Sequence, residues 1–128
     1  LGYTCANDVS ARDIQRRERR YTRAKGYDTF CPLGPAVRLA GSGFVPEEHA
    51  IECRVNGQVR QRSGLDDLIF AIPEVVSFIS QVMTLRVGDV ILTGTPAGVG
   101  PLEAGDRVEV AIDGIGALRN EVARQNDT

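Results

Sequence analysis

The chain has 128 residues, of which 42% are hydrophobic, 25% charged and 5% aromatic, and its formal net charge is −2. These values are ordinary for one modest globular domain with a core of its own. No apolar run approaches the roughly 20 residues of a membrane-spanning helix, and no basic-then-apolar leader opens the sequence. We therefore expect neither a membrane segment nor export.

The cysteines point to a reducing environment. Cys5, Cys31 and Cys53 are odd in number and widely spaced, and they form no C-x-x-C motif. Neither a zinc knuckle nor a disulfide scaffold is expected from this pattern. We predict a cytoplasmic location.

The opening residues indicate a chain that starts inside a larger fold. The first residue is not an initiator methionine, and residues 1–6 read as the end of a buried strand. Ser10 and Asp13 have the spacing of a capping box, which predicts a short helix over residues 11–16. The stretch that follows, residues 16–35, reads as a long functional loop.

A hairpin and a helix are predicted in the middle of the chain. Residues 51–55 alternate apolar and charged side chains, as a half-buried strand does. The Asn-Gly pair at 56–57 favours a type I′ turn, with a returning strand at 58–62. Pro73 suits the first position of a helix, and apolar residues at helical spacing extend that helix over 73–83.

The last third of the chain turns to β-structure. Two Gly-Asp pairs are each typical of a turn that precedes a strand. The repetition of this turn-and-strand pattern predicts two similar, neighbouring strands. The turns are at 88–89 and 105–106, and their strands at 90–92 and 108–112. A further turn at 113–114 leads into a strand at 115–118. Many short strands with one clear helix predict a mainly β fold with few helices.

Three motifs carry polar residues in patterns too specific for a core or a linker. Residues 7–15 read NDVSARDIQ, residues 25–35 read KGYDTFCPLGP, and residues 92–100 read LTGTPAGVG. In this order they resemble the fumarylacetoacetate hydrolase (FAH) family, whose members act on 2-oxo acids and 1,3-dicarbonyl compounds with a divalent metal. The resemblance runs from Gly2 to about Val122.

The resemblance implies a fold and the boundaries of the domain. Members of the family form a mixed β-sandwich roll, which would be incomplete in this chain. Residues 1–122 would be the C-terminal part of the catalytic domain, and residues 123–128 a frayed polar tail.

Asp8 is the candidate metal ligand. From local sequence alone it reads equally as a turn or cap residue, but the resemblance makes it the third metal carboxylate of the family. Mg²⁺ or Mn²⁺ would suit such oxygen ligands. The family's other two carboxylates form a Glu-x-Glu pair, and none occurs in these 128 residues. The resemblance therefore places those ligands, and the acid/base group, outside this sequence.

Four further residues are site candidates through the resemblance. Lys25 would stabilise negative charge on an enolate, and Thr29 would lie beside the metal. Gln15 and Thr95 would contact the substrate. Gln15 follows Asp8 by seven residues, about two helical turns, so the two can face one side. The plainer alternatives are a solvated lysine and a β-turn without a ligand.

Three other polar residues are expected to stay outside the chemistry. Arg12 and Asp13 are adjacent, and such neighbours often pair structurally. His49, the only histidine, lies in a polar connecting segment.

The implied function is that of a metal-dependent enzyme. It would act on a small dicarboxylic or 2-oxo acid through a metal-chelated enolate. The family's reactions include C–C hydrolysis of acylpyruvates, isomerisation of 2-hydroxyhepta-2,4-diene-1,7-dioate, and decarboxylation of oxaloacetate. Aromatic-compound catabolism and a homodimer are the expected setting.

A polyanion-binding or nucleic-acid-binding module is the alternative. Six of the fifteen basic residues lie within residues 16–25, between Arg16 and Lys25, with five of them in the run from Arg16 to Arg23. The net charge, the few aromatics and the lack of a recognition motif count against it. We expect no nucleic-acid partner.

Overall fold

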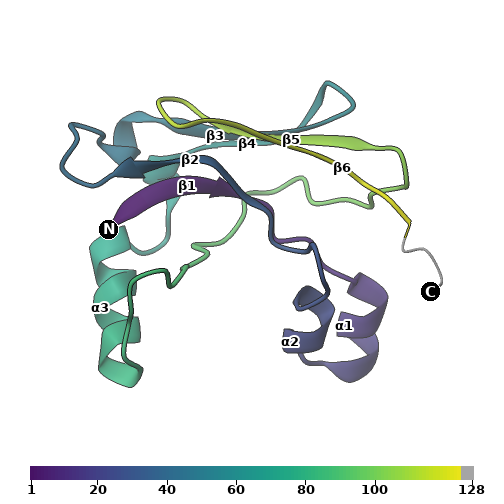
Figure 1. The fold of residues 1–128 in the computed structure, drawn as a ribbon, viewed down its shortest axis with the longest axis horizontal. Helices are drawn as coiled ribbons and strands as arrows, with labels where there is room; N and C mark the ends of the chain where they lie inside the picture. Colours follow the sequence, from purple (N-terminus) through teal and green to yellow (C-terminus); the bar gives the residue numbers. More distant parts are fainter. Residues whose placement is uncertain (125–128) are drawn as a thin grey trace.

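The computed structural model describes residues 1–124, which form two antiparallel sheets and three α-helices (Figure 1). The smaller sheet pairs β1 (Gly2–Ala6) with β2 (Leu33–Leu39). The larger sheet has the order β4-β3-β5-β6. Its strands are β3 (Ala50–Val55), β4 (Gln58–Gly64), β5 (Arg107–Ile112) and β6 (Gly116–Glu121). The expected mainly β fold is confirmed.

The helices lie on one side of the sheets. α1 (Arg12–Glu18) and α2 (Thr22–Lys25) pack together near one end, and α3 (Ile72–Val82) lies near the other (Figure 1). Single 3₁₀ turns, Pro46–Glu48 and Leu65–Asp67, flank the β3–β4 hairpin. Within residues 1–124, no helix is long and apolar enough to cross a membrane.

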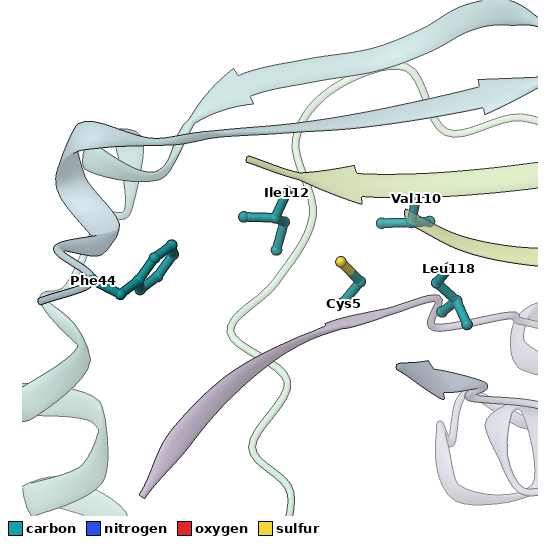
Figure 2. Close-up of a cluster of buried hydrophobic side chains, with 5 residues drawn as sticks. All are labelled: Cys5, Phe44, Val110, Ile112 and Leu118. Carbon is teal, nitrogen blue, oxygen red and sulfur yellow. The ribbon is translucent and has the colours of Figure 1, made fainter. Parts of the chain in front are cut away.

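A small core joins the two sheets. Its buried side chains come from β1, the β2–β3 connection, β5 and β6, and they are Cys5, Phe44, Val110, Ile112 and Leu118 (Figure 2). Alternation in β5 places its valines and isoleucine inward and its charged residues outward. Burial raises the pKa of the Cys5 thiol, which favours the neutral form in this apolar setting. All three cysteines are free.

The outer face of the larger sheet is charged. Glu109 forms an ion pair with Arg119 on the neighbouring strand, and Arg54 Nε lies 2.5 Å from Glu52 Oε1. Opposite charges alternating across strands are typical of a face in contact with water. The apolar face of the sheet is therefore the one that covers the core.

Much apolar surface remains uncovered in this chain. The accessible area is 9672 Å², whereas a compact monomer of 13.8 kDa would expose roughly 6,600 Å². Phe78 of α3 is 70% exposed and Ile69 before it is 91% exposed. An open groove of about 440 Å³ runs between α3 and residues 85–92. Residues 66–100 thus contribute little to the core.

The hairpin and the long helix are confirmed. Asn56 and Gly57 have φ values of 52° and 81°, as a type I′ turn requires. The helix expected over 73–83 is α3, and it begins one residue earlier. The Glu74 carboxylate caps its start by accepting the Ala71 N–H at 2.9 Å.

Two predictions for the first third of the chain need correction. The helix expected over 11–16 is present as α1, but Ser10 does not cap it, because its hydroxyl donates to the Asp8 carbonyl at 3.2 Å. Residues 16–35 are not one long loop, since they include the end of α1, all of α2 and the start of β2. A four-residue helix leaves no periodic pattern that sequence reading can detect.

The strand expected at 90–92 is absent, although its turn is formed. Gly88 and Gly105 both have φ of 94°, and the carboxylates of Asp89 and Asp106 each accept a backbone N–H three residues earlier. Of the two turns, the second leads into a strand, β5, because among residues 1–124 an adjacent strand supplies hydrogen-bond partners there and not at 90–92. The strand expected at 115–118 is β6. Of the expected tail, residues 125–128 lie outside the described residues.

Asp106 makes a prediction about acid stability. Hydrogen bonds from the Glu103 N–H and the Asn56 amide hold the pKa of its carboxyl below the usual range. The resulting stabilisation is present above the unfolded pKa, roughly 3.9, and is lost as pH falls through the folded pKa. In the intact protein, Asp106→Asn should therefore lower the melting temperature at pH 7 more than at pH 3. Asp113→Asn, at an exposed turn, is the control. An equal loss at both pH values would contradict the prediction.

Candidate active site

Asp8 occupies a tight turn at the end of β1. The Val9 N–H donates to the Asn7 carbonyl at 3.0 Å, which places Asp8 at the centre of a three-residue turn. The Asn7 N–H is bonded in turn to the Pro32 carbonyl at 3.2 Å, next to the start of β2. The Asp8 side chain is 31% exposed, so a ligand can reach its carboxylate.

A backbone hydrogen bond joins this turn to α2. The Ala11 N–H donates to the Ala24 carbonyl at 2.9 Å, and Ala24 is fully buried. Lys25 is the next residue and the last of α2. Gly26 then ends the helix, where a Cβ would lie 2.8 Å from the Thr22 carbonyl oxygen. This packing fixes the point from which the lysine side chain extends.

Lys25 and Asp8 meet as an ion pair. The Lys25 ammonium donates to Oδ2 of Asp8 across 17 positions of sequence. The lysine side chain is 35% exposed, so both groups remain partly open to solvent. The structure thus brings together two of the residues that the motifs single out, and it places a fixed positive charge beside an accessible carboxylate.

Thr29 lies in a strained turn just beyond Lys25. The Phe30 N–H donates to the Tyr27 carbonyl at 3.1 Å, so Asp28 and Thr29 are the central residues of a β-turn. Thr29 has φ of 66°, a conformation that is rare for β-branched residues. Such strain tends to occur at functional sites. Among the described residues, no hydrogen bond joins the Thr29 side chain to Asp8 or Lys25.

Gln15 lies on α1, and no continuous helix connects it to Asp8. Residues 8–11 precede α1, so the helical-spacing argument that put Asp8 and Gln15 on one side is wrong. The side-chain Oε1 of Gln15 accepts a hydrogen bond from the Arg12 guanidinium at 2.7 Å. Arg12 therefore pairs with Gln15 rather than with Asp13.

Thr95 is held by β4 and not by the Asp8 turn. Gln61 Nε2 donates to the Thr95 hydroxyl and to the Pro96 carbonyl, both at 2.7 Å. Sequence analysis missed Gln61 because its partners lie 34 and 35 positions away. No local pattern marks such a residue.

His49 and the arginine run have structural explanations. The His49 ring stacks on Phe44 with centroids 4.4 Å apart and planes 10° from parallel. Arg23 lies 2.6 Å from Glu18, and this carboxylate is the main cause that raises the pKa of Arg23. Part of the positive charge of the run is therefore neutralised locally.

The described residues do not form a complete cation site. Among residues 1–124, no three His, Cys, Asp or Glu side chains converge on a point that could hold a metal ion. Asp8 offers one hard oxygen ligand, which is too few for a divalent cation. Two surface hollows do not mark the site either. One is lined by residues of β5 and β6, the other lies between α3 and residues 85–92, and neither is lined by Asp8, Lys25 or Thr95.

Residues 1–123 match the family model of the fumarylacetoacetate (FAA) hydrolase C-terminal region. The chain belongs to this family. The resemblance carried by the three motifs is thereby confirmed over nearly the whole sequence. The mixed β architecture described above is the fold of the family's C-terminal region.

Three relatives illustrate the similarity. A crystal structure of 5-carboxymethyl-2-hydroxymuconate delta-isomerase from Mycobacterium smegmatis is 53% identical with a TM-score of 0.93, covering 99% of this chain and 49% of that one. Oxaloacetate tautomerase YisK of Bacillus subtilis is 44% identical over 95% of this chain and 43% of its own. Maleylpyruvate hydrolase from Sphingobium sp. SYK-6 is 40% identical with a TM-score of 0.85, covering 95% and 44%. The chain spans about half the length of the curated relatives it matches.

The backbone at Thr29 yields a stability prediction. Because a left-handed conformation costs a β-branched residue about 1–3 kcal/mol, Thr29→Gly should raise the free energy of unfolding of the intact protein by about 1 kcal/mol. Thr22→Gly, within α2, should lower it by about 0.5–1 kcal/mol. Denaturant titration measures both. A loss in Thr29→Gly as large as in the control would show that no strain is stored there.

Proposed function

We propose that this chain forms one part of the active site of an enzyme that acts on a 2-oxo or 1,3-dicarbonyl acid. The observation that carries the proposal is the ion pair between Lys25 and Asp8. It joins two of the family's motifs across a gap of sixteen residues and leaves both groups open to a ligand. A purely structural ion pair would not need a turn centred on Asp8 or a strained turn beside Lys25.

The chemistry of the relatives' substrates supports the same class. The names of three relatives specify 5-carboxymethyl-2-hydroxymuconate, oxaloacetate and maleylpyruvate. Each compound is a 2-oxo acid or its 2-hydroxy enol form. Removal of a proton from the carbon next to such an oxo group leaves negative charge on the oxo oxygen. A shared need to stabilise that charge would explain why similar active sites in these relatives serve different reactions.

Lys25 suits this task. A fixed ammonium beside the reacting oxygen stabilises charge that develops in the transition state and needs no reorganisation to do so. Its attachment to a buried helix end keeps that charge in place. In our proposal Gln15, whose amide N–H groups make no hydrogen bond among residues 1–124, contacts the substrate, and Thr29 lines the site next to Lys25.

A divalent cation, Mg²⁺ or Mn²⁺, is part of the proposal, with Asp8 as one of its ligands. When bound, it would act as a Lewis acid that polarises the 2-oxo group. The remaining ligands and the general base would come from outside the 128 residues. The relatives' unmatched half is long enough to supply them and to cover the exposed apolar side chains of α3.

The setting of the enzyme is proposed on the same basis. We place it in the cytoplasm as a homodimer, acting in the breakdown of aromatic compounds. Three free cysteines agree with a reducing compartment. C–C hydrolysis, isomerisation, keto–enol tautomerisation and decarboxylation all remain within the class. Assays of the intact protein with Mg²⁺ on acylpyruvates, oxaloacetate and hydroxymuconate-type acids would identify the reaction.

The first functional prediction concerns Asp8. Asp8→Asn keeps the shape of the side chain but removes the charge that a divalent cation requires. Turnover and Mg²⁺ affinity of the intact enzyme should fall by orders of magnitude, while the melting temperature changes little. Asp13→Asn, an exposed carboxylate five residues later, is the matched control. Calorimetry and steady-state kinetics measure the effect, and wild-type Mg²⁺ affinity in Asp8→Asn would remove Asp8 from the site.

The second functional prediction concerns Lys25. Lys25→Met keeps much of the apolar stem, so a solvated lysine would tolerate it. If the ammonium stabilises transition-state charge, kcat should fall about 10²–10³-fold, with a smaller change in KM. Arg20→Met, an exposed basic residue in the same segment, should leave kcat unchanged. Unaltered kcat in Lys25→Met, or a collapsed melting temperature, would rule out the catalytic role.

A further inference from the structure

We propose that Gln61 is a positioning residue that holds the Thr95 turn and orients the Thr95 hydroxyl toward an acidic group of the substrate. The inference rests on the proposed function for the identity of the ligand. The anchoring itself depends only on contacts within this chain. Gln61 lies on β4, outside the three motifs that carry the family resemblance.

The Gln61 side-chain amide donates two hydrogen bonds to the turn. Nε2 lies 2.7 Å from the Thr95 hydroxyl oxygen and 2.7 Å from the Pro96 carbonyl oxygen. Because the Pro96 carbonyl can only accept, the amide nitrogen must be the atom that faces it. One side chain therefore fixes two consecutive residues of the turn.

A bulge in β4 supports this arrangement. Cys53 pairs with Gln61 and Arg54 with Val59, so Arg60 is an additional residue in β4. A bulge re-aims the side chains beside it and is frequent next to active sites. Cys53 packs against the core, and its cross-strand partner Gln61 therefore points to the inner face of the sheet, from which residues 93–100 are reached.

Gly98 shows independently that the turn is seated on β4. Its φ is 103°, and a Cβ built on it would lie 1.9 Å from the Arg60 carbonyl oxygen and 3.1 Å from Gln61 Cγ. Any side chain at this position would push the turn away from the strand. The turn and the bulge thus meet through backbone and through the Gln61 amide.

The hydrogen bond also sets the polarity of Thr95. A hydroxyl has one hydrogen to donate and two lone pairs to accept. Since Thr95 accepts from Gln61, its own hydrogen points elsewhere and is available to an acceptor. A carboxylate oxygen is the strongest such acceptor in a 2-oxo acid. Gln61 thereby occupies one lone pair of the Thr95 hydroxyl and leaves its hydrogen free to be donated.

The test uses the intact enzyme with Gln61→Leu, which removes both donors, and Gln61→Glu, which replaces them with an acceptor. Gln58→Leu on the same strand is the matched control, since among the described residues its side chain makes no hydrogen bond. Gly98→Ala displaces the turn by a separate route. If Gln61→Leu fails to fold, Gln61→Asn shortens the amide by one methylene and serves in its place.

The first readout does not depend on activity. NMR order parameters of the backbone N–H groups of residues 94, 95 and 97–99 should fall from about 0.85 to below about 0.6 in Gln61→Leu. They should stay at the wild-type value in Gln58→Leu. An unchanged, rigid turn in Gln61→Leu would overturn the anchoring, whether or not the enzyme acts on an oxo acid.

The second readout is kinetic, with oxaloacetate as the probe. Gln61→Leu and Thr95→Val should each raise KM roughly tenfold with little change in kcat. The double variant should be no worse than either single one, because both remove the same interaction. Gln61→Glu should raise KM further, since its carboxylate would capture the Thr95 hydrogen. If the KM increases of the two single variants multiply in the double variant, Gln61 does not act through Thr95 and its role is only structural. If the wild type does not turn over oxaloacetate, the probe is the acylpyruvate or hydroxymuconate-type acid that it does turn over. Absence of turnover of all three would refute the proposed function, and the NMR result alone would then decide the anchoring.

Discussion

The hydrogen bond from the Ala11 N–H to the Ala24 carbonyl determines where the charged groups of the candidate site meet. It joins the turn after β1 to a helix of only four residues, too short to be stable by itself. Burial of Ala24 supplies the stability that the helix lacks. Lys25 then leaves the helix end next to Asp8. Together with the packing of α1 on α2, this contact fixes the position of residues 22–25 relative to the carboxylate.

Two scaffolds therefore support the polar groups of this chain. Asp8, Lys25 and Thr29 belong to turns and a short helix beside the β1–β2 sheet, whereas Thr95 belongs to a turn seated on the edge strand β4. The core that joins the two sheets is small, with Cys5 at its centre (Figure 2). Relative placement of the two groups thus depends on the packing of β1 and β2 against β5 and β6. Changes in that core would reach the site through the sheets.

The uncovered apolar surface is a second consequence of this organisation. α3 has a regular apolar face, and several of its large side chains are exposed, among them Phe78 and Val82. Contiguous exposed apolar surface of this kind marks contact with other polypeptide. The relatives are about twice as long as this chain. Their additional length is sufficient for such a contact.

Local chemistry was enough for part of this structure. The β3–β4 hairpin could be predicted because Asn56 and Gly57 tolerate positive φ, and α3 because its apolar residues recur at helical spacing after Pro73. The three motifs also sufficed to recognise the family and to single out Asp8, Lys25 and Thr95. Each of these inferences depends on residues close together in the sequence.

The tertiary structure decided what depends on distant partners. The apolar residues at 90–92 form no strand because a strand needs hydrogen bonds from a neighbour, and residues 1–124 provide none there. Ser10 could have capped α1, but its hydroxyl bonds to the Asp8 turn instead. The partners of Gln61 lie more than thirty positions away in the sequence, so no local sequence pattern around Gln61 reveals them. Sequence therefore singled out the candidate groups for the chemistry, and packing between remote segments determined which of those candidates meet.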